Sequence, residues 1–200
     1  MTRVVLATRN TGKIVELRRI LAEARVPVDL VGLEEFPHIG EVAETGLTFA
    51  ENSLLKAHAV AAASGLPAVA DDSGLCVDAL NGMPGIFSAR WSGSHGDDKA
   101  NLDLLLAQVG DVPDGRRQAH FACTAALALP SGEEHVVEGF VHGVLIREPL
   151  GSNGFGYDPI FVPDGETRTT AEMSAEEKDA ISHRGKAFRA LALIMGRVLA

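Results

Sequence analysis

The sequence is poor in cysteine and has no long apolar run. Cys76 and Cys123 are its only cysteines, and they form neither a CxxC motif nor a metal-binding spacing. We therefore expect two reduced, buried thiols and no disulfide. A run of about 20 apolar residues is absent, so no membrane-spanning helix is expected, and the apolar stretch at 4–7 is too short for a signal peptide. The cytoplasm is the expected location.

Several catalytic patterns are also missing. The seven histidines form no HxH or HExxH motif, which argues against a zinc site. There is no GxSxG motif, and neither cysteine lies in a catalytic pattern. The net charge is −9, from 27 acidic and 18 basic residues. Such a chain repels nucleic-acid phosphates on average, so we expect no nucleic-acid partner, although a local basic pocket for a small anion is compatible with this charge.

What is present is an ordinary globular composition, with 46% hydrophobic residues. A chain of 200 residues fits one domain, or one domain with two lobes around a cleft. Residues 3–7 predict a buried strand, the stripe of Ile14, Leu17 and Leu21 predicts a helix, and residues 28–31 predict a second strand. This β-α-β opening favours an α/β fold.

A capping box of Thr48 and Glu51 predicts a helix to about residue 64, with Leu55, Ala59 and Ala62 facing inward. The other predicted elements are a strand at 68–70 that ends abruptly at Asp71, a helix at 98–109, an antiparallel hairpin of 120–129 with 134–146, a strand at 160–162, and a last helix at 183–199. Together they predict an α/β fold whose mixed, partly antiparallel central sheet is flanked by helices.

The polar segment Thr8-Arg9-Asn10-Thr11-Gly12-Lys13 lies between the first strand and the first helix. The N–H groups and dipole of a helix N-terminus suit a phosphate. Thr8 and Asn10 add neutral donors, Gly12 permits close approach of the backbone, and Lys13 adds a positive charge. The segment is not a Walker P-loop. An ordinary strand-to-helix turn is the alternative interpretation.

A second polar segment, Asp71-Asp72-Ser73-Gly74, follows an apolar strand. Adjacent carboxylates point to different sides, so one can bind a hard cation while the other activates a water. Glu44, in the acidic loop at 32–46, would complete a magnesium site. The alternatives are a simple turn at 71–74 and a solvated acidic face around Glu44.

Lys56 lies in the middle of the predicted second helix among apolar neighbours. A functional role for it needs a nearby anion, and the alternative is a side chain that extends to water. Lys178 and the segment Ser182-His183-Arg184 gather basic groups near the start of the last helix. Because cations oppose the helix dipole there, this cluster favours a further partner over a plain surface patch.

The glycine-rich loop at 151–159 contains Phe155, Gly156, Tyr157 and Asp158. Such a loop can present an aromatic ring to the flat face of a ligand. The alternative is a tight loop whose aromatic side chains pack into the core. Aromatic residues are scarce in this chain, which has one Tyr and one Trp.

Taken in order, these segments resemble the inosine/xanthosine triphosphate pyrophosphatase family, which cleanses the nucleotide pool. The motifs that carry the resemblance are LATRNTGK (6–13), ETGLTF (44–49) with EN (51–52), LKA (55–57), ADDSGL (70–75), PGIFSAR (84–90), GFGYDP (154–159), and Lys178 with SHRG (182–185). They occur in the family's order and span almost the whole chain, so the set is far more specific than any single motif.

The resemblance implies a two-lobed fold with the active-site cleft between the lobes, a homodimer, and a requirement for Mg²⁺. By this likeness the segment 8–13 and Lys56 bind the triphosphate. Asp72 is the general base or a metal-linked carboxylate, and Glu44 and Asp71 also lie around the metal. The residues implied to contact the rest of the substrate are Ser73, Phe155, Gly156, Tyr157, Asp158, Lys178, His183 and Arg184, with Phe155 stacking on the purine.

The expected activity is hydrolysis of ITP, dITP or XTP to the monophosphate and pyrophosphate. Water attacks the α-phosphorus, Asp72 accepts its proton, and Lys13 and Lys56 offset the charge on the leaving pyrophosphate. A donor such as Arg184 favours a 6-oxopurine over adenine. One alternative is a pyrophosphatase of related fold for pyrimidine or methylated nucleotides. The other is a non-catalytic nucleotide-binding sensor, which has no use for the three carboxylates together.

Overall fold

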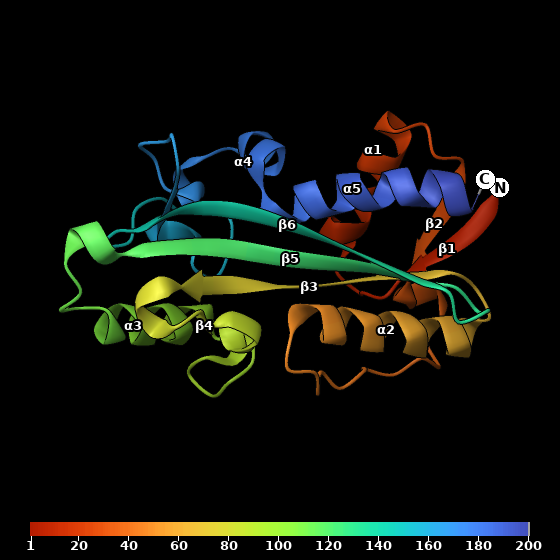
Figure 1. The fold of residues 1–200 in the computed structure, drawn as a ribbon, viewed down its shortest axis with the longest axis horizontal. Helices are drawn as coiled ribbons and strands as arrows, with labels where there is room; N and C mark the ends of the chain where they lie inside the picture. Colours follow the sequence, from red (N-terminus) through yellow and green to blue (C-terminus); the bar gives the residue numbers. More distant parts are fainter. Residues whose placement is uncertain (200) are drawn as a thin grey trace. The chain divides into compact units, whose positions relative to one another are not determined.

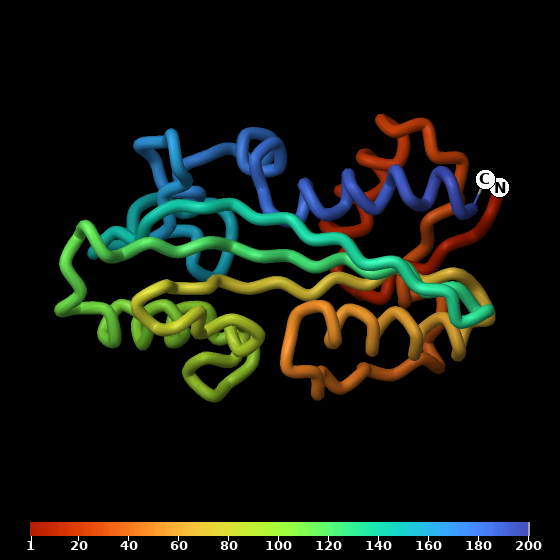
Figure 2. The backbone as a smooth tube through the Cα atoms, in the orientation of Figure 1, coloured from red at the N-terminus to blue at the C-terminus, as the bar shows by residue number. Residues whose placement is uncertain are grey.

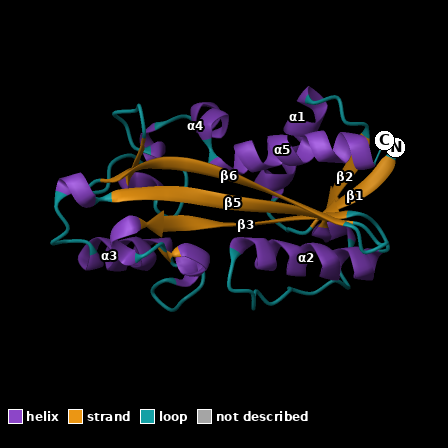
Figure 3. Ribbon diagram, viewed as in Figure 1, coloured by secondary structure: helices purple, strands orange, loops and turns teal. Residues whose placement is uncertain are grey.

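The computed structural model describes residues 1–199. The strands are β1 (Thr2–Leu6), β2 (Val28–Gly32), β3 (Ala68–Val77), β4 (Met83–Pro84), β5 (Gln118–Ala128), β6 (Glu134–Leu145) and β7 (Phe161–Pro163). The α-helices are α1 (Thr11–Glu23), α2 (Phe49–Ser64), α3 (Asp98–Gln108), α4 (Ala175–Ile181) and α5 (His183–Val198) (Figures 1 and 3). Within the described chain, no helix is both long and apolar enough to cross a membrane.

The strands hydrogen-bond in the order β2-β1-β3-β5-β6-β7, and β4 pairs with β3. β1 is parallel to β2 and β3, whereas β3–β4 and β6–β7 are antiparallel. The predicted mixed sheet with flanking helices is therefore confirmed. β5 and β6 are sheet neighbours joined by a short loop, in which the Leu129 N–H donates to the Glu133 carbonyl, as predicted for the hairpin.

The chain divides into two compact units. Unit 1 comprises Met1–Asp72, Cys123–Gly139 and the segment from Arg184 onward, and unit 2 comprises Ser73–Ala122 and Phe140–His183. The chain passes from one unit to the other within β3, β5 and β6 and at the start of α5, a path that can be followed by colour in Figure 2.

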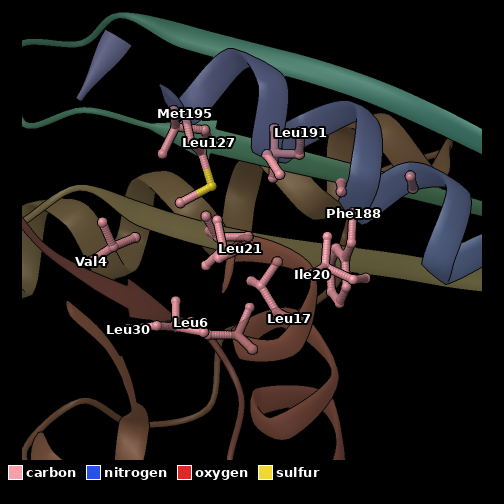
Figure 4. Packing of buried hydrophobic residues seen from close by; sticks show 14 of the residues in the cluster. Val4, Leu6, Leu17, Ile20, Leu21, Leu30, Leu127, Phe188, Leu191 and Met195 are labelled. Carbon is pink, nitrogen blue, oxygen red and sulfur yellow. The ribbon is translucent and has the colours of Figure 1, made fainter. Parts of the chain in front are cut away.

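Unit 1 buries two apolar clusters because its strands alternate their side chains between two faces. In β5, Ala125 and Leu127 belong to a cluster that α1 and α5 cover, whereas Ala126 and Ala128 belong to one that α2 covers. Figure 4 shows the first cluster, in which the labelled residues are Val4, Leu6, Leu17, Ile20, Leu21, Leu30, Leu127, Phe188, Leu191 and Met195. The predicted stripe of α1 is confirmed, and α5 buries Phe188, Leu191 and Met195. Burying each large apolar side chain contributes about 1.5–3 kcal/mol.

Unit 2 has its own apolar core. Leu75 of β3, Leu105 of α3, Phe121 of β5 and Phe161 of β7 are buried in it. The rings of Phe121 and Phe161 meet edge to face, with centroids 4.8 Å apart. Of the two cysteines, Cys76 lies in this unit and Cys123 in unit 1, and both are free and buried as predicted.

The predicted inward face of α2 is wrong. Leu55 is 41% exposed, and Ala59 and Ala62 are also exposed. The buried residues of this helix are Asn52, Ser53, Ala57, Val60 and Ala61. A prediction from apolar residues alone selects the wrong face of the helix, because the buried face carries two polar residues, Asn52 and Ser53. Their hydrogen bonds within the protein compensate for the hydrogen bonds to water that they lose on burial.

The capping box of α2 is only half formed. Thr48 Oγ accepts from the Glu51 N–H at 3.1 Å, as predicted. The Glu51 carboxylate, however, accepts from the Leu47 N–H at 2.6 Å instead of from Thr48. The predicted end of the helix is confirmed, since Gly65 adopts the left-handed conformation with φ 69°.

Candidate active site

The segment between β1 and α1 is a capped helix start. Asn10 Oδ1 accepts from the N–H groups of Gly12 at 2.9 Å and Lys13 at 3.3 Å, and Thr8 Oγ accepts from the Asn10 N–H at 3.1 Å. The cap satisfies two N–H groups of the helix N-terminus, those of Gly12 and Lys13. Thr11 begins α1.

Arg9 extends away from this helix start. Its guanidinium donates to the Ile39 carbonyl at 2.9 Å and to the Leu33 carbonyl at 3.4 Å. Arg9 thereby fastens the segment before α1 to the loop at 33–39, a structural role that the sequence does not reveal.

Asp71 lies between two cations. Lys13 Nζ is 2.9 and 2.8 Å from its two carboxylate oxygens, and Arg184 Nε is 3.2 Å from Oδ2. Asp71 is only 4% exposed. Burial alone raises the pKa of this carboxyl, but the opposing effect of Lys13, Arg184 and Lys56 is larger and holds the pKa well below its usual range. Burial lowers the pKa of Arg184, but the nearby Asp71, Cys123 and Glu16 together outweigh that effect and raise it.

Asp72 has different partners, two of which are side chains of α2. Asn52 Nδ2 donates to Asp72 Oδ2 at 3.0 Å, and Lys56 Nζ is 4.0 Å from Asp72 Oδ1. The same ammonium is 2.6 Å from Glu44 Oε1. Lys56 therefore has the nearby anions that a functional role requires, and its ammonium is shared by two carboxylates.

The two aspartates do not form a turn. The strand predicted to end at Asp71 continues through Asp72 and Ser73 to Val77. Ser73, the first residue of unit 2, is half-buried. The alternative of a simple turn at 71–74 is therefore wrong. A Cβ on Gly74 would lie 2.3 Å from the Gly85 carbonyl oxygen. Gly74 thus allows the backbone at Gly85 to lie close to β3.

Unit 2 contains a cluster centred on Asp158, which is 3% exposed. Its carboxylate accepts from the Phe155 N–H at 2.8 Å and from Thr170 Oγ at 2.8 Å, and it forms an ion pair with Lys178. The Lys178 ammonium lies 5.0 Å from the centroid of the Phe155 ring, in cation–π contact. Phe155 is 63% exposed. The loop therefore presents this ring to solvent.

Tyr157 follows the alternative interpretation of the loop. It is buried, its hydroxyl donates to the Ser88 carbonyl at 2.9 Å, and burial raises its pKa. The Gly156 N–H donates to Asp98 Oδ2 at 2.8 Å. His183 is half-buried and stacks on Phe121 with ring centroids 5.0 Å apart. Tyr157 and His183 thus have structural partners within unit 2.

Two groups of predicted site residues are thus assembled. Lys13, Asp71 and Arg184 form one cluster with Glu44, Lys56 and Asp72 beside them in unit 1, and Phe155, Asp158 and Lys178 form another in unit 2. The sequence analysis assigned no role to Asn52 or Thr170, which hold the two key carboxylates. The available signal for Asn52 was its position one helical turn before Lys56.

The carboxylates fit a hard divalent cation in part. Within residues 1–199, no three His, Cys, Asp or Glu side chains gather closely enough to hold a metal by themselves. Glu44 and Asp72 nevertheless share one cation, the Lys56 ammonium, and both offer oxygen donors. Mg²⁺ commonly binds to one or two carboxylates plus substrate phosphates, and this pair meets that requirement. Asp71 is already engaged by Lys13 and Arg184.

Comparisons with known proteins agree over nearly the whole chain. The model of the Ham1 family matches residues 4–194. A dITP/XTP pyrophosphatase of Streptomyces coelicolor is 69% identical over 199 residues, covering 100% of both chains. The crystal structure of a nucleoside-triphosphatase / dITP/XTP pyrophosphatase from Mycobacterium abscessus is 56% identical, with a TM-score of 0.81 over 95% of this chain and 98% of that one. A HAM1 protein from Coxiella burnetii is 38% identical, with a TM-score of 0.92 over 99% and 100%.

Proposed function

The chain belongs to the Ham1 family, and from this membership we propose that it hydrolyses the non-canonical purine nucleoside triphosphates ITP, dITP and XTP. The products are the nucleoside monophosphate and pyrophosphate, which makes the protein a hydrolase of phosphoric anhydrides. The full-length similarity to dITP/XTP pyrophosphatases carries this proposal. The charged clusters of the two units support it, because each contains groups suited to one part of such a substrate.

The triphosphate binds to the cations of unit 1. Lys13 and Lys56 each pair with a carboxylate in the protein alone, at 2.8 Å from Asp71 and 2.6 Å from Glu44. An ammonium forms stronger, charge-assisted hydrogen bonds with phosphate oxygens than with water. Thr8 and Asn10 add neutral hydrogen-bonding groups beside Lys13. As the bond between the α-phosphorus and the bridging oxygen breaks, the two ammonium groups offset the negative charge that develops on the pyrophosphate.

Asp72 acts on the attacking water. One oxygen of its carboxylate is held by Asn52, and the other faces Lys56. A carboxylate held in this way can accept the proton of a water molecule while the water oxygen bonds to the α-phosphorus. The proton passes to Asp72, and the bonding electrons of the cleaved P–O bond leave with pyrophosphate.

Glu44 and Asp72 are the residues that would hold Mg²⁺. When bound, the metal neutralises phosphate charge and orients the triphosphate. Asp71, which the sequence analysis also assigned to the metal, has a different role in this proposal: it orients Lys13 and Arg184, with which it forms ion pairs.

The base is recognised by unit 2. The exposed Phe155 ring offers a stacking surface, and the Lys178 ammonium beside it offers hydrogen-bond donors. Hypoxanthine and xanthine present an acceptor oxygen at position 6, where adenine presents an amino donor. A pocket whose donor is paired by the 6-oxo group rejects adenine because the donor would otherwise stay unpaired. Asp158 fixes the position of this donor.

The protein acts as a homodimer in this proposal, as the family resemblance implies. Light scattering on the purified 200-residue chain is expected to give twice the monomer mass.

A substrate panel tests the proposed activity. Pyrophosphate release is measured with ITP, dITP, XTP, GTP, ATP and UTP, with and without Mg²⁺. The proposal requires metal-dependent release that favours ITP, dITP and XTP over ATP by orders of magnitude. Preference for UTP would support the pyrimidine alternative, and binding without release from any triphosphate would support a sensor.

A further inference from the structure

The N-terminal half of α2 presents two polar side chains toward the same two partners. Asn52 and Lys56 are one helical turn apart and therefore lie on one face of the helix. Lys56 contacts Glu44 at 2.6 Å and Asp72 at 4.0 Å. Asn52 contacts the same acidic loop and the same aspartate, through Gly46 and Asp72.

The hydrogen bonds of Asn52 use both ends of its carboxamide. Oδ1 accepts from the Gly46 N–H at 2.8 Å, and Nδ2 donates to Asp72 Oδ2 at 3.0 Å. The residue is 0% exposed. A buried carboxamide with both ends engaged has one orientation, since a flipped amide would set its oxygen against the carboxylate and its N–H₂ against the Gly46 N–H.

This orientation distinguishes the two oxygens of Asp72. Oδ2 accepts from Asn52, and Oδ1 is the oxygen 4.0 Å from the Lys56 ammonium. The rotation of the carboxylate is therefore set from α2. The same carboxamide accepts from the Gly46 N–H, two residues from Glu44, so Asn52 also contacts the loop that carries the second carboxylate facing Lys56.

We infer that Asn52 is a positioning residue for the hydrolysis, acting through Asp72 and not by touching the substrate. This inference rests on the proposed function. It gives the buried polar face of α2 a catalytic purpose. Partners that orient a reacting or metal-binding carboxylate typically contribute about 10- to 100-fold in activity.

Two substitutions separate positioning from a structural role. Asn52→Leu removes both hydrogen bonds. Asn52→Asp keeps the shape and the acceptor for the Gly46 N–H but replaces the donor to Asp72 by a carboxylate oxygen. If Asn52 only fastens the loop at Gly46, the Asp variant keeps the wild-type kcat. If it positions Asp72, both variants lower kcat for dITP about 10- to 100-fold while KM changes little.

Ser53→Ala is the matched control. Ser53 is equally buried on the same helix, but its hydroxyl donates to the carbonyls of Phe49 and Thr124, both at 2.8 Å. Its loss is expected to lower the melting temperature with no change in kcat. Asn52→Ser, whose hydroxyl is too short to reach Asp72, replaces Asn52→Leu if that variant fails to fold.

The possible outcomes distinguish a failure of the positioning role of Asn52 from a failure of the proposed function. An active wild type together with an Asp variant at wild-type kcat, or one whose KM alone rises, would overturn the positioning role and leave the proposed function intact. A wild type that releases no pyrophosphate from dITP or XTP would overturn the proposed function, and the role of Asn52 with it. A lowered kcat in the Asp and Leu variants beside an unchanged Ser53→Ala kcat is the expected result.

Discussion

Asp71 and Asp72 are consecutive residues of β3 whose carboxylates contact helices on opposite sides of the strand. Asp71 accepts from Lys13 of α1 and Arg184 of α5, whereas Asp72 accepts from Asn52 of α2 and faces Lys56. The alternation of side chains along a strand produces this separation. One carboxylate is thereby paired with two cations, and its neighbour is held by Asn52 beside Lys56.

Replacing Asp72 by Asn tests the proposed role of its carboxylate as the proton acceptor. The substitution keeps the size of the side chain and removes the group that accepts the proton. We expect kcat for dITP to fall by about 100-fold or more, because positioned acid–base groups typically contribute 10²–10⁴-fold. Pyrophosphate release gives the rate, and a thermal melt checks the fold. Turnover near the wild-type rate would remove Asp72 from the mechanism.

Asp71→Asn is expected to act mainly on stability, since it leaves Lys13 and Arg184 without their anionic partner. Removing one member of a buried ion pair typically costs about 3–5 kcal/mol in the free energy of unfolding. Asp29→Asn is the control, because Asp29 forms an exposed pair with Arg3 and its loss should change the free energy by no more than about 0.5 kcal/mol. Urea unfolding at pH 7 measures both.

The stability contributed by Asp71 also depends on pH. Its pKa is lowered in the folded protein, so the contribution is fully present above the ordinary unfolded pKa of about 4 and is lost as the pH falls toward the lower folded value. The difference between the wild type and Asp71→Asn should therefore be constant from about pH 7 to 5 and shrink below about pH 4. A difference that grows on acidification would contradict this assignment.

Glu44→Gln tests the metal site. A carboxamide keeps the shape of the side chain but is a much weaker Mg²⁺ ligand than a carboxylate. We expect the Mg²⁺ concentration for half-maximal activity to rise about tenfold or more. Glu41→Gln, an exposed change in the same acidic loop, serves as the control and should leave that concentration unchanged. Equal Mg²⁺ dependence in both variants would exclude Glu44 from the metal site.

Phe155→Ala tests the stacking surface. The ring is largely exposed, so its removal should change the free energy of unfolding little. Loss of a base–aromatic stack typically costs about 1–3 kcal/mol, which predicts a rise in KM for dITP of about 5- to 150-fold. Leu193→Ala, an equally exposed apolar truncation on α5, controls for a general surface effect. If KM responds to neither change, Phe155 does not contact the base.

Gly154 and Gly156 provide a matched pair in the loop. Both have positive φ, 77° and 61°, so Ala at either position incurs a backbone penalty of about 1–2 kcal/mol. A Cβ at 154 would also lie 2.1 Å from Asp158 Oδ2, whereas at 156 nothing lies within 4 Å. Gly154→Ala should therefore be the less stable variant in urea unfolding, and it should raise KM for dITP through displacement of Asp158. Equal unfolding free energies would show that the loop relaxes around the methyl group.

The elements that follow from local patterns were predictable from the sequence. The stripe of Ile14, Leu17 and Leu21 and the β-α-β opening appear as predicted. Each depends on contacts between residues close in the chain or on a simple apolar period.

The incorrect predictions concern polar side chains that are buried because residues distant in the sequence form hydrogen bonds or ion pairs with them. The buried face of α2 was misplaced because Asn52 and Ser53 are buried through partners about 20 and 71 residues away. The strand at Asp71 was ended too early because Lys13 and Arg184, 58 and 113 residues away, compensate its charge inside the sheet. Neither compensation can be inferred from local composition. The expectation that the site residues act together came from the family motifs and not from local patterns.

Product analysis of a single substrate is the most direct test of the central claim that this chain cleaves dITP by attack of water on the α-phosphorus. The reaction is run with Mg²⁺ in ¹⁸O-labelled water, and the products are separated and weighed by mass spectrometry. The account predicts dIMP carrying one ¹⁸O atom and unlabelled pyrophosphate. Formation of dIDP and phosphate, or a label found in pyrophosphate instead of dIMP, would contradict it.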